Sequence, residues 1–322
     1  LCYFNKHNKI ISFDFKSNLD KLNNRGPDSS AVLEIDNILL GFTRLAINGL
    51  NEESMQPFSL DDNLFCICNG EIYNYKELAK QYNIPLFTGS DCEIILPLYK
   101  KLGIKGLCDS LDGVFAFVIY DKNTSTIYAA RDPYGVRPLF IGITPENNIM
   151  ISSEIKAIHN QCIEIESFKP GSFMNLNNLE YIPYLDKSFS SLVKHDMDTI
   201  LNLTNKYLTE AVNKRMMSDV EIGCLLSGGV DSSLICALVS KHYKFKKLHT
   251  FSIGLKNSPD LIYAKKVADY LGTNHHEIIL TEEDVINSVE EVIYALESYD
   301  VTTVRASIGN YLIGKYISED QN

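Results

Sequence analysis

The chain has 322 residues, of which 45% are hydrophobic and 22% are charged, and its net charge is −11. This length allows two domains, and the composition is that of an ordinary globular protein. An acidic chain without a long lysine- or arginine-rich run does not favour nucleic acid or an anionic membrane as its main partner. No apolar stretch is as long as a transmembrane helix, and the first residues do not resemble a signal peptide.

The eight cysteines indicate a reducing compartment. None of them has the C-x-x-C spacing of a zinc or redox motif, and several lie within apolar runs. Buried free thiols are typical of cytosolic proteins, in which disulfides are rare. We therefore predict a cytoplasmic protein that has neither structural disulfides nor a zinc site.

Residues 1–185 consist of short strand-like runs, and one helix is predicted at 91–103. The runs are separated by turns that contain asparagine, glycine and proline, which favours a strand-rich domain. The predicted strands are 10–15, 32–40, 64–68, 113–120, 125–130 and 139–143.

Four polar motifs in this first region carry the residue types that an amidase for an amino-acid substrate requires. An arginine binds an α-carboxylate and an acidic side chain binds an α-ammonium group, because fixed opposite charges hold both ends of the substrate. Amide hydrolysis also needs two donors aimed at the developing oxyanion, which Asn69 and the backbone N–H of Gly70 can supply. The motifs are Arg25-Gly26-Pro27-Asp28, Gly41-Phe42-Thr43-Arg44, Asn69-Gly70-Glu71 and Thr88-Gly89-Ser90-Asp91.

Each of these motifs also has a purely structural interpretation. Asn69-Gly70 is compatible with a hairpin turn, Ser90-Asp91 with the N-cap of the following helix, and 25–28 with a surface turn. It is their occurrence together, in this order, that favours a common site.

The character of the sequence changes near residue 186. The stretch 186–199 is polar, and we predict that it links a first domain at 1–185 to a second domain at 200–322. A helical pattern starts near Met197, and strands then alternate with helices, which is typical of a parallel, doubly wound sheet. The predicted strands are 220–226, 247–253 and 275–280, and the predicted helices are 230–243, 260–271, 282–296 and 305–318.

The segment 225–233 contains the most specific motif of the chain. Its apolar start ends in Ser-Gly-Gly at 227–229, and a helical pattern follows. Glycines let the backbone approach a phosphate closely, and a helix N-terminus presents free N–H groups to it. Ser227, Ser232 and Ser233 add hydroxyl donors, and Asp231 fits if Mg²⁺ accompanies the phosphates. We predict a nucleotide phosphate site, although an ordinary glycine turn before a helix is the alternative.

These motifs resemble two known domains. The segment 225–233 is similar to the SGGxDS pyrophosphate loop of ATP-pyrophosphatases, and the four earlier motifs, with 111–117 and 131–139, resemble the glutaminase domain of class II glutamine amidotransferases. Together with 258–261, 271–277 and 299–307, they make the whole chain similar to the glutamine-hydrolysing asparagine synthetases. The resemblance implies an α+β N-terminal-nucleophile glutaminase sandwich, followed by an incomplete α/β doubly wound ATP-pyrophosphatase domain.

The resemblance also implies roles for individual residues. In the first domain, Arg44 would bind the carboxylate of glutamine, Glu71 and Asp91 its amino group, and Asn69 and Gly70 its developing oxyanion, with Asn69 also contacting the bound glutamine. In the second domain, the residues implied for ATP and pyrophosphate are Leu226, Ser227, Gly228, Gly229, Asp231, Ser232 and Ile253. Asp231 would also hold Mg²⁺. Aspartate and its adenylate would contact Thr302, Thr303 and Arg305, for which an N-capped surface helix is the alternative.

The nucleophile of the family is an N-terminal cysteine whose free α-amine acts as the base. One alignment makes Cys2 this nucleophile, which requires that Leu1 is removed or stands for an initiator methionine. The other alignment places residues 1–4 in the strand just after the nucleophile, with about four residues missing, and it keeps the spacing to Arg25 nearer to that of the family. We favour the second alignment, on which this chain has little or no glutaminase activity. Because the family continues beyond residue 322, we expect the sequence to be truncated at both ends.

The resemblance implies a ligase that makes L-asparagine from L-aspartate through β-aspartyl-AMP, with glutamine as nitrogen donor and with ATP and Mg²⁺. The expected partners are these small molecules, and a homodimer is also considered. Two alternatives remain open. One is another class II amidotransferase with an adenylating domain, and the other is a catalytically inactive fragment that only binds ligands or a partner.

Overall fold

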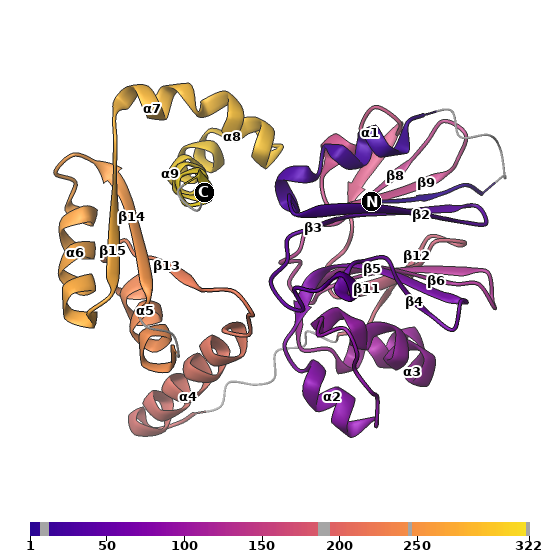
Figure 1. Ribbon diagram of the computed structural model, residues 1–322, viewed down its shortest axis with the longest axis horizontal. Helices are drawn as coiled ribbons and strands as arrows, with labels where there is room; N and C mark the ends of the chain where they lie inside the picture. The colour runs from indigo at the N-terminus through magenta and orange to yellow at the C-terminus, as the bar shows by residue number, and fades with distance from the viewer. Residues whose placement is uncertain (7–12, 186–193, 244–246, 320–322) are drawn as a thin grey trace. The chain divides into compact units, whose positions relative to one another are not determined.

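The computed structural model describes residues 1–6, 13–185, 194–243 and 247–319. The chain divides into two compact units, Leu1–Ser191 and Leu192–Asn322 (Figure 1). Of the predicted linker 186–199, residues 186–193 lie outside the described part of the chain. Helix α4 already begins at Met197, so the last three residues of the predicted linker are helical instead.

The first unit consists of two stacked antiparallel sheets with helices on their outer faces (Figure 1). Among the described residues, one sheet has the strand order β10-β8-β9-β1-β3-β2 and the other has the order β12-β11-β7-β6-β5-β4. The strands are β1 Cys2–Phe4, β2 Ser29–Ile35, β3 Ile38–Arg44, β4 Phe58–Leu60, β5 Leu64–Ile72, β6 Gly113–Asp121, β7 Thr126–Arg131, β8 Phe140–Ile143, β9 Ile149–Ser152, β10 Glu164–Ser167, β11 Ser172–Asn175 and β12 Glu180–Pro183. The helices are α1 Phe15–Asp20, α2 Tyr75–Gln81 and α3 Ile95–Ser110, with 3₁₀ turns η1 Asn23–Arg25, η2 Glu52–Ser54, η3 Asp91–Ile94 and η4 Ile155–Ala157.

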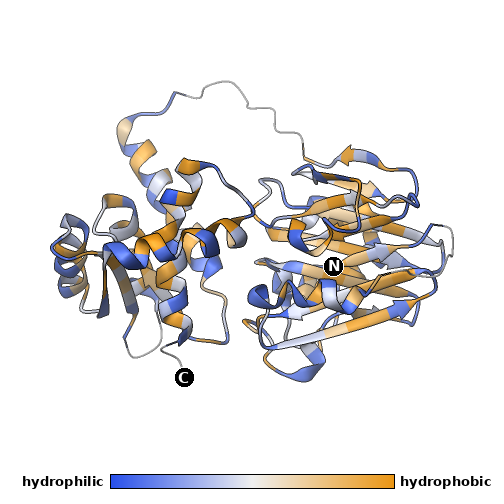
Figure 2. Ribbon diagram, turned by 90° about the horizontal axis from the view of Figure 1, so that it is seen from above, coloured by the Kyte–Doolittle hydropathy of each residue, from blue (hydrophilic) through white to orange (hydrophobic). Residues whose placement is uncertain are grey.

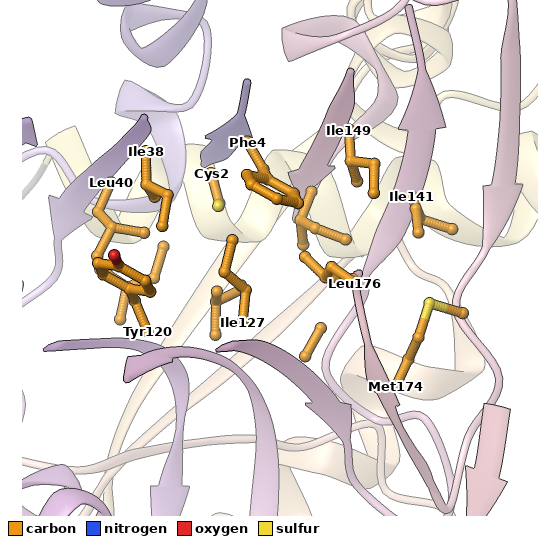
Figure 3. Close-up of a cluster of buried hydrophobic side chains, with 14 of the residues drawn as sticks. Cys2, Phe4, Ile38, Leu40, Tyr120, Ile127, Ile141, Ile149, Met174 and Leu176 are labelled. Atoms are coloured by element: carbon orange, nitrogen blue, oxygen red, sulfur yellow. The ribbon is translucent and has the colours of Figure 1, made fainter. Parts of the chain in front are cut away.

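The main core of this unit lies between the two sheets, because alternate residues of each strand point to opposite faces. In β1, Cys2 and Phe4 face the layer between the sheets, where they pack against Ile127 and other apolar residues (Figure 3). Leu1 and Tyr3 face the other way and pack beneath α1. Figure 2 shows hydrophobic residues along the strands and hydrophilic residues in many of the outer loops.

Several predicted elements of the first unit differ from the structure. Of the predicted strand 10–15, residues 10–12 lie outside the described residues, and Phe15 begins helix α1. The predicted strand 32–40 is two strands, β2 and β3, because the chain turns at Asp36, which has a φ of 52°. Aspartate adopts this left-handed conformation more readily than most residues. The predicted helix 91–103 is a 3₁₀ turn at its start, and its predicted end coincides with a kink at Gly103, which has a φ of 69° within α3.

The second unit confirms the predicted alternation of strands and helices. Its described residues contain a parallel sheet of order β13-β14-β15, with α6 and α9 on opposite sides of it (Figure 1). The elements are α4 Met197–Arg215, β13 Gly223–Leu225, α5 Val230–His242, β14 His249–Leu255, α6 Pro259–Leu271, β15 Asn274–Leu280, α7 Glu282–Asn287, α8 Val289–Leu296 and α9 Val301–Glu319. The predicted helix 282–296 is interrupted at Ser288. No helix in the described ranges is both long enough and apolar enough to cross a bilayer.

Candidate functional site

A cavity of about 180 Å³ in the first unit brings most of the predicted residues of that domain together. This volume is several times the roughly 30 Å³ that one water molecule occupies in the liquid. Residues of both sheets and of the loops between them line it. The charged and polar residues around it include Arg25, Arg44, Asn69, Gly70, Glu71, Asp91, Arg137 and Ser153.

Arg44 lies at the end of β3 and is held in a fixed position. Its Nη1 donates a hydrogen bond to the carbonyl of Asn51 at 2.9 Å, and its Nη2 donates to the carbonyl of Gly49. The side chain is only 8% exposed. A guanidinium has five N–H donors, so these two bonds leave others for a ligand in the cavity. The arrangement suits a carboxylate, which an arginine can bind through two parallel bonds.

Asn69 and Gly70 lie within strand β5, so the alternative of a hairpin turn at these residues is wrong. They pair with Ala116 and Phe115 of β6. A Cβ atom on Gly70 would lie 2.3 Å from the carbonyl oxygen of Val114, and only glycine fits this close approach. At Asn69 and Gly70 strand β5 pairs with β6 on one side only, because β4 pairs with β5 no further than Cys66.

The side chain of Gln56 holds β5 from its other edge. Its Oε1 accepts the backbone N–H of Cys68 at 2.6 Å, and its Nε2 donates to the carbonyl of Cys68 at 3.2 Å. Gln56 is 5% exposed and precedes β4, which pairs with β5 only as far as Cys66. The amide therefore continues the hydrogen-bond ladder up to the residue before Asn69.

Asp91 is the first residue of η3 and is almost completely buried. Its Oδ2 accepts the backbone N–H of Ile72 at 2.6 Å, and burial raises the pKa of its carboxyl to about 6. Ser90 is the N-cap residue of η3, as the structural alternative for Ser90-Asp91 predicts, but its side chain makes no capping hydrogen bond. Glu71 lies nearby and forms an ion pair with Arg137, with 3.5 Å between Oε1 and Nη2.

The loop that carries Arg137 is organised by two buried residues that precede it. The carboxylate of Asp132 accepts the backbone N–H groups of Tyr134, Val136 and Arg137 at 2.9–3.0 Å. The guanidinium of Arg131 donates to the carbonyls of Arg137 at 2.7 Å and Gly135 at 2.9 Å. These bonds explain why the Arg-Asp-Pro pattern is followed by a fixed loop, and they place Arg137 in the cavity wall.

The structure does not place Cys2 in this cavity. Its side chain is fully buried in the core between the sheets, and this burial raises the pKa of its thiol to about 12 (Figure 3). Leu1, the residue before it, does line the cavity. Leu1 and Gly41 exchange backbone hydrogen bonds of 2.9 and 2.7 Å, so the pairing of β1 with β3 extends to the cavity edge.

In the second unit, 227–229 forms the predicted tight turn between β13 and α5. Gly228 has a φ of +77°, and a Cβ atom there would lie 2.5 Å from atoms of Tyr263 and Ala264. Both facts require glycine. Gly229 is the N-cap of α5, so the first N–H groups of the helix lie beside the turn. The turn and helix form the geometry that binds phosphate groups in other proteins.

Serine hydroxyls stabilise this turn in the structure. Ser232 Oγ accepts the backbone N–H of Ser227 at 3.2 Å and lies 3.0 Å from Ser227 Oγ. Asp231 is exposed in the first turn of α5. Leu226 is buried, with its N–H donated to the carbonyl of Phe251 at 2.8 Å. Ile253 is in the neighbouring strand β14, two residues before its end.

Thr302, Thr303 and Arg305 are exposed residues at the start of α9. Thr303 donates both its backbone N–H, at 2.8 Å, and its hydroxyl, at 2.7 Å, to Oδ2 of Asp300. This is the geometry of the N-capped surface helix that the sequence left as an alternative. Helix α9 contacts β14, so these residues belong to the same layered unit as Ile253.

The described residues contain no group of three or more histidine, cysteine or acidic side chains placed to hold a metal ion. Magnesium bound to a nucleotide commonly needs only one or two protein carboxylates, because phosphates and waters fill its other positions. The single exposed carboxylate of Asp231, one turn from the glycines, fits this limited requirement.

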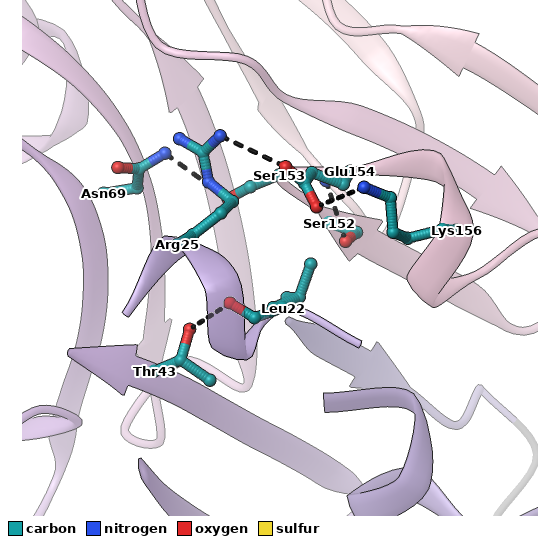
Figure 4. Close-up of polar contacts among 8 residues, drawn as sticks. All are labelled: Leu22, Arg25, Thr43, Asn69, Ser152, Ser153, Glu154 and Lys156. Atoms are coloured by element: carbon teal, nitrogen blue, oxygen red, sulfur yellow. Dashed lines mark hydrogen bonds and ion pairs between the residues drawn. The ribbon is translucent and has the colours of Figure 1, made fainter. Parts of the chain in front are cut away.

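Sequence reasoning gave no role to Arg137, Ser153 or Glu154, which the structure places in or beside the cavity. Ser153 Oγ accepts a hydrogen bond of 3.4 Å from Nδ2 of Asn69 (Figure 4). The run Ser-Ser-Glu-Ile-Lys at 152–156, directly after the apolar residues 149–151, is the signal that could have drawn attention to this turn.

Two family models match this chain. Residues 2–210 match the family model described as a glutamine amidotransferase domain, and the chain therefore belongs to that family. Residues 204–321 match the model described as asparagine synthase. The predicted resemblance to asparagine synthetases and the predicted fold class are both confirmed.

Two curated proteins align with almost the whole chain. A probable glutamine-hydrolysing asparagine synthetase of Acanthamoeba polyphaga mimivirus is 43% identical over 94% of this chain and 60% of its own length. The asparagine synthetase of Rattus norvegicus is 39% identical over 93% of this chain and 59% of its own length. The chain thus spans about three fifths of these curated relatives. A solved structure of an allosteric regulatory enzyme of purine biosynthesis covers 86% of this chain and 78% of its own, with a TM-score of 0.43 and 17% identity.

Proposed function

We propose that this protein makes L-asparagine from L-aspartate, with glutamine as the nitrogen donor and ATP as the activating substrate. One observation carries the proposal. One cavity in the amidotransferase unit is lined by a fixed guanidinium, a buried carboxyl and two neighbouring donors on one strand. The same chain continues into a unit whose glycine turn and helix N-terminus suit the phosphates of ATP.

In the first unit, the proposed reaction is hydrolysis of the glutamine side-chain amide. Arg44 would bind the α-carboxylate, and Asp91 with Glu71 would bind the α-ammonium group. The side-chain amide would then lie against Asn69 and the N–H of Gly70, which donate hydrogen bonds to the oxyanion as it forms. Such preorganised donors stabilise the transition state more than the ground state, and losing one typically costs about 10²–10³ in rate.

The proposed nucleophile is a cysteine with a free α-amine that would precede Leu1. This choice follows the alignment in which Cys2 lies four positions after the nucleophile. Two observations support this choice: Leu1 lines the cavity, and the Cys2 thiol faces the core. An α-amine titrates near pH 7.7–8.0, so it can accept the thiol proton close to neutral pH. The thiolate would attack the amide carbon, ammonia would leave, and water would hydrolyse the thioester to release glutamate.

In the second unit, the aspartate β-carboxylate would attack the α-phosphorus of ATP and release pyrophosphate. Ammonia would then displace AMP from β-aspartyl-AMP to give asparagine. We assign the phosphate contacts to Ser227, Gly228, Gly229 and Ser232, the adenine side to Leu226 and Ile253, and the aspartate contacts to Thr302, Thr303 and Arg305. Magnesium, held to the phosphates and to Asp231, would neutralise charge on the departing pyrophosphate.

The test is the complete reaction of the protein, carrying Met-Cys-Gly-Ile ahead of Leu1, with glutamine, aspartate and Mg-ATP. We expect asparagine, glutamate, AMP and pyrophosphate in equal amounts, with ammonia able to replace glutamine. Glutamine hydrolysis without aspartate-dependent release of pyrophosphate would favour another class II amidotransferase. Binding of glutamine and ATP without any turnover would favour the inactive alternative.

We also propose a cytoplasmic location and an oligomeric state for this protein. All eight cysteines are free, and seven of them are buried, as expected for a protein of the reducing cytoplasm. A homodimer is the proposed assembly. Subcellular imaging of the tagged protein and sedimentation of the purified protein test these two points.

A further inference from the structure

The turn after strand β9 brings a hydroxyl from one sheet against the proposed oxyanion donor of the other sheet. Ser153 follows β9, whereas Asn69 lies in β5, 84 residues earlier in the chain. Nδ2 of Asn69 donates to Ser153 Oγ at 3.4 Å, and both residues line the cavity (Figure 4). Hydrogen bonds of catalytic groups are often long in a ligand-free site and shorten when the substrate is bound.

The next residue, Glu154, fixes the turn that carries Ser153. Its Oε1 lies 3.3 Å from Nη1 of Arg25, and its Oε2 lies 3.1 Å from Nζ of Lys156 (Figure 4). The Glu154 and Lys156 side chains are only 14% and 11% exposed. Each oxygen of the Glu154 carboxylate therefore has its own cationic partner. Because Glu154 and Lys156 are largely shielded from water, the loss of one partner would destabilise the turn.

The backbone of the turn is held as well. The N–H of Glu154 donates to Oγ of Ser152 at 3.2 Å, and Ser152 is 1% exposed at the end of β9. A side-chain oxygen that accepts a backbone N–H two residues further on is a common stabiliser of tight turns. Ser153 is thus presented by a turn that is anchored on both sides.

We propose that Ser153 is a positioning residue that orients the Asn69 amide for catalysis, and that Glu154 supports it by holding the turn. The inference rests on the glutaminase function proposed above. The Asn69 amide has two N–H donors. If one is held by Ser153, the plane of the amide is fixed and the second donor keeps one direction in the cavity. Without that partner the amide rotates readily, because the last torsion of asparagine is broad.

The hydrogen bond between Ser153 and Asn69 should affect the rate of the chemical step and not the affinity for glutamine. A donor that is already aligned needs no reorganisation when the oxyanion develops. The hydrogen bond of Ser153 is to Asn69, and not to Arg44 or Asp91, to which we assign the carboxylate and the ammonium group. Its loss should therefore lower kcat and leave KM for glutamine nearly unchanged. A residue that only stabilised the fold would not separate these two constants in this way.

The experiment is steady-state glutaminase kinetics on the full-length protein with its N-terminal cysteine in place. We expect Ser153→Ala to lower kcat about tenfold, which is less than the roughly 10²–10³ expected for losing the donor itself in Asn69→Ala. KM for glutamine should stay within about twofold, and Ser153→Thr should restore most of kcat because it keeps the hydroxyl. Ser59→Ala, an exposed serine of β4, is the matched control and should leave both constants unchanged.

A double-mutant cycle makes the test specific to Asn69. If Ser153 acts through the Asn69 amide, Ser153→Ala has no further effect on kcat in an Asn69→Ala background. Glu154→Gln should lower kcat in the same way and should not add to Ser153→Ala. A full tenfold effect of Ser153→Ala in the Asn69→Ala background, or wild-type kcat in Ser153→Ala itself, would overturn the inference alone. A wild-type protein that does not hydrolyse glutamine would overturn the proposed function together with it.

Discussion

Oδ2 of Asp91 accepts the backbone N–H of Ile72 at 2.6 Å, which ties the 88–91 loop to the end of the strand that carries Asn69 and Gly70. The carboxyl proposed to bind the substrate ammonium group is therefore attached to the strand proposed to bind the oxyanion. A substrate whose ammonium group is bound by Asp91 is therefore held at a fixed distance from the oxyanion donors, Asn69 and Gly70. Asp91 is only 4% exposed, and this burial raises the pKa of its carboxyl to about 6.

This raised pKa predicts that glutamine binding weakens in mild acid. Only the ionised carboxylate of Asp91 attracts an ammonium group, and the ionised fraction falls as the pH drops through about 6. At pH 5 about one tenth of the protein is competent, so KM for glutamine should rise about tenfold relative to neutral pH. Glutaminase kinetics between pH 5 and 8 measure this change. A KM that is constant from pH 5 to 7 would contradict the assignment of Asp91.

The same carboxyl should make folding less favourable at neutral pH. Its pKa is raised above the ordinary value of 3.8, so its contribution to stability is fully present below pH 3.8 and is lost as the pH rises through about 6. We expect Asp91→Asn to stabilise the protein at pH 7 by on the order of 2–3 kcal/mol. Urea unfolding of both proteins at pH 4 and pH 7 tests the prediction. The difference should be small at pH 4, and an equal difference at both values would speak against it.

Arg44 should be needed for glutamine but not for ammonia. Arg44→Ala removes charge-assisted hydrogen bonds to the substrate carboxylate, each worth about 1.5–3 kcal/mol. KM for glutamine should therefore rise by at least tenfold in the full-length protein. Asparagine synthesis from added ammonia does not use this cavity and should continue. If both activities fall in parallel, Arg44 has a structural role, because its bonds to Gly49 and Asn51 also hold the following loop.

Cys2 should be dispensable for glutamine hydrolysis. Its side chain packs in the core, so Cys2→Ala should cost only a modest amount of stability, about 1 kcal/mol for a small buried group. Glutaminase activity of a protein that carries Met-Cys-Gly-Ile ahead of Leu1 should survive this change. A glutamine-analogue electrophile should label the added cysteine, as mapped by mass spectrometry. Label on Cys2 with Leu1 absent from the N-terminal peptide would establish the other alignment.

Asp231 should support the use of Mg-ATP. Its exposed carboxylate lies in the first turn of α5, beside the proposed phosphate site. Asp231→Ala should weaken aspartate-dependent ATP–pyrophosphate exchange on the order of 10–100-fold, the cost usually seen when a group that supports a metal site is removed. Asp260→Ala, in the first turn of α6, is a matched control. Unchanged exchange in Asp231→Ala would remove this residue from the site.

The sequence by itself determined the elements whose signals are local. The turn at 227–229 was predicted correctly because strand, glycines and helix are adjacent in the chain, and the left-handed φ of Gly228 needs no distant partner to be inferred. The alternation of strands and helices after Met197 was predictable for the same reason. The family of the chain was also recognisable, because the order of its motifs is a property of the sequence.

Only the tertiary structure decided features that depend on residues far apart. Asn69-Gly70 is a typical turn pair, and its place inside a strand follows from the register of β5 against β6, more than 40 residues later. The face of β1 that carries Cys2 is set by the second sheet, and the contact of Asn69 with Ser153 joins two sheets. The pKa of Asp91 depends on the burial that all these layers create. Pairing register, burial and desolvation arise from packing between distant segments, and no local pattern encodes them.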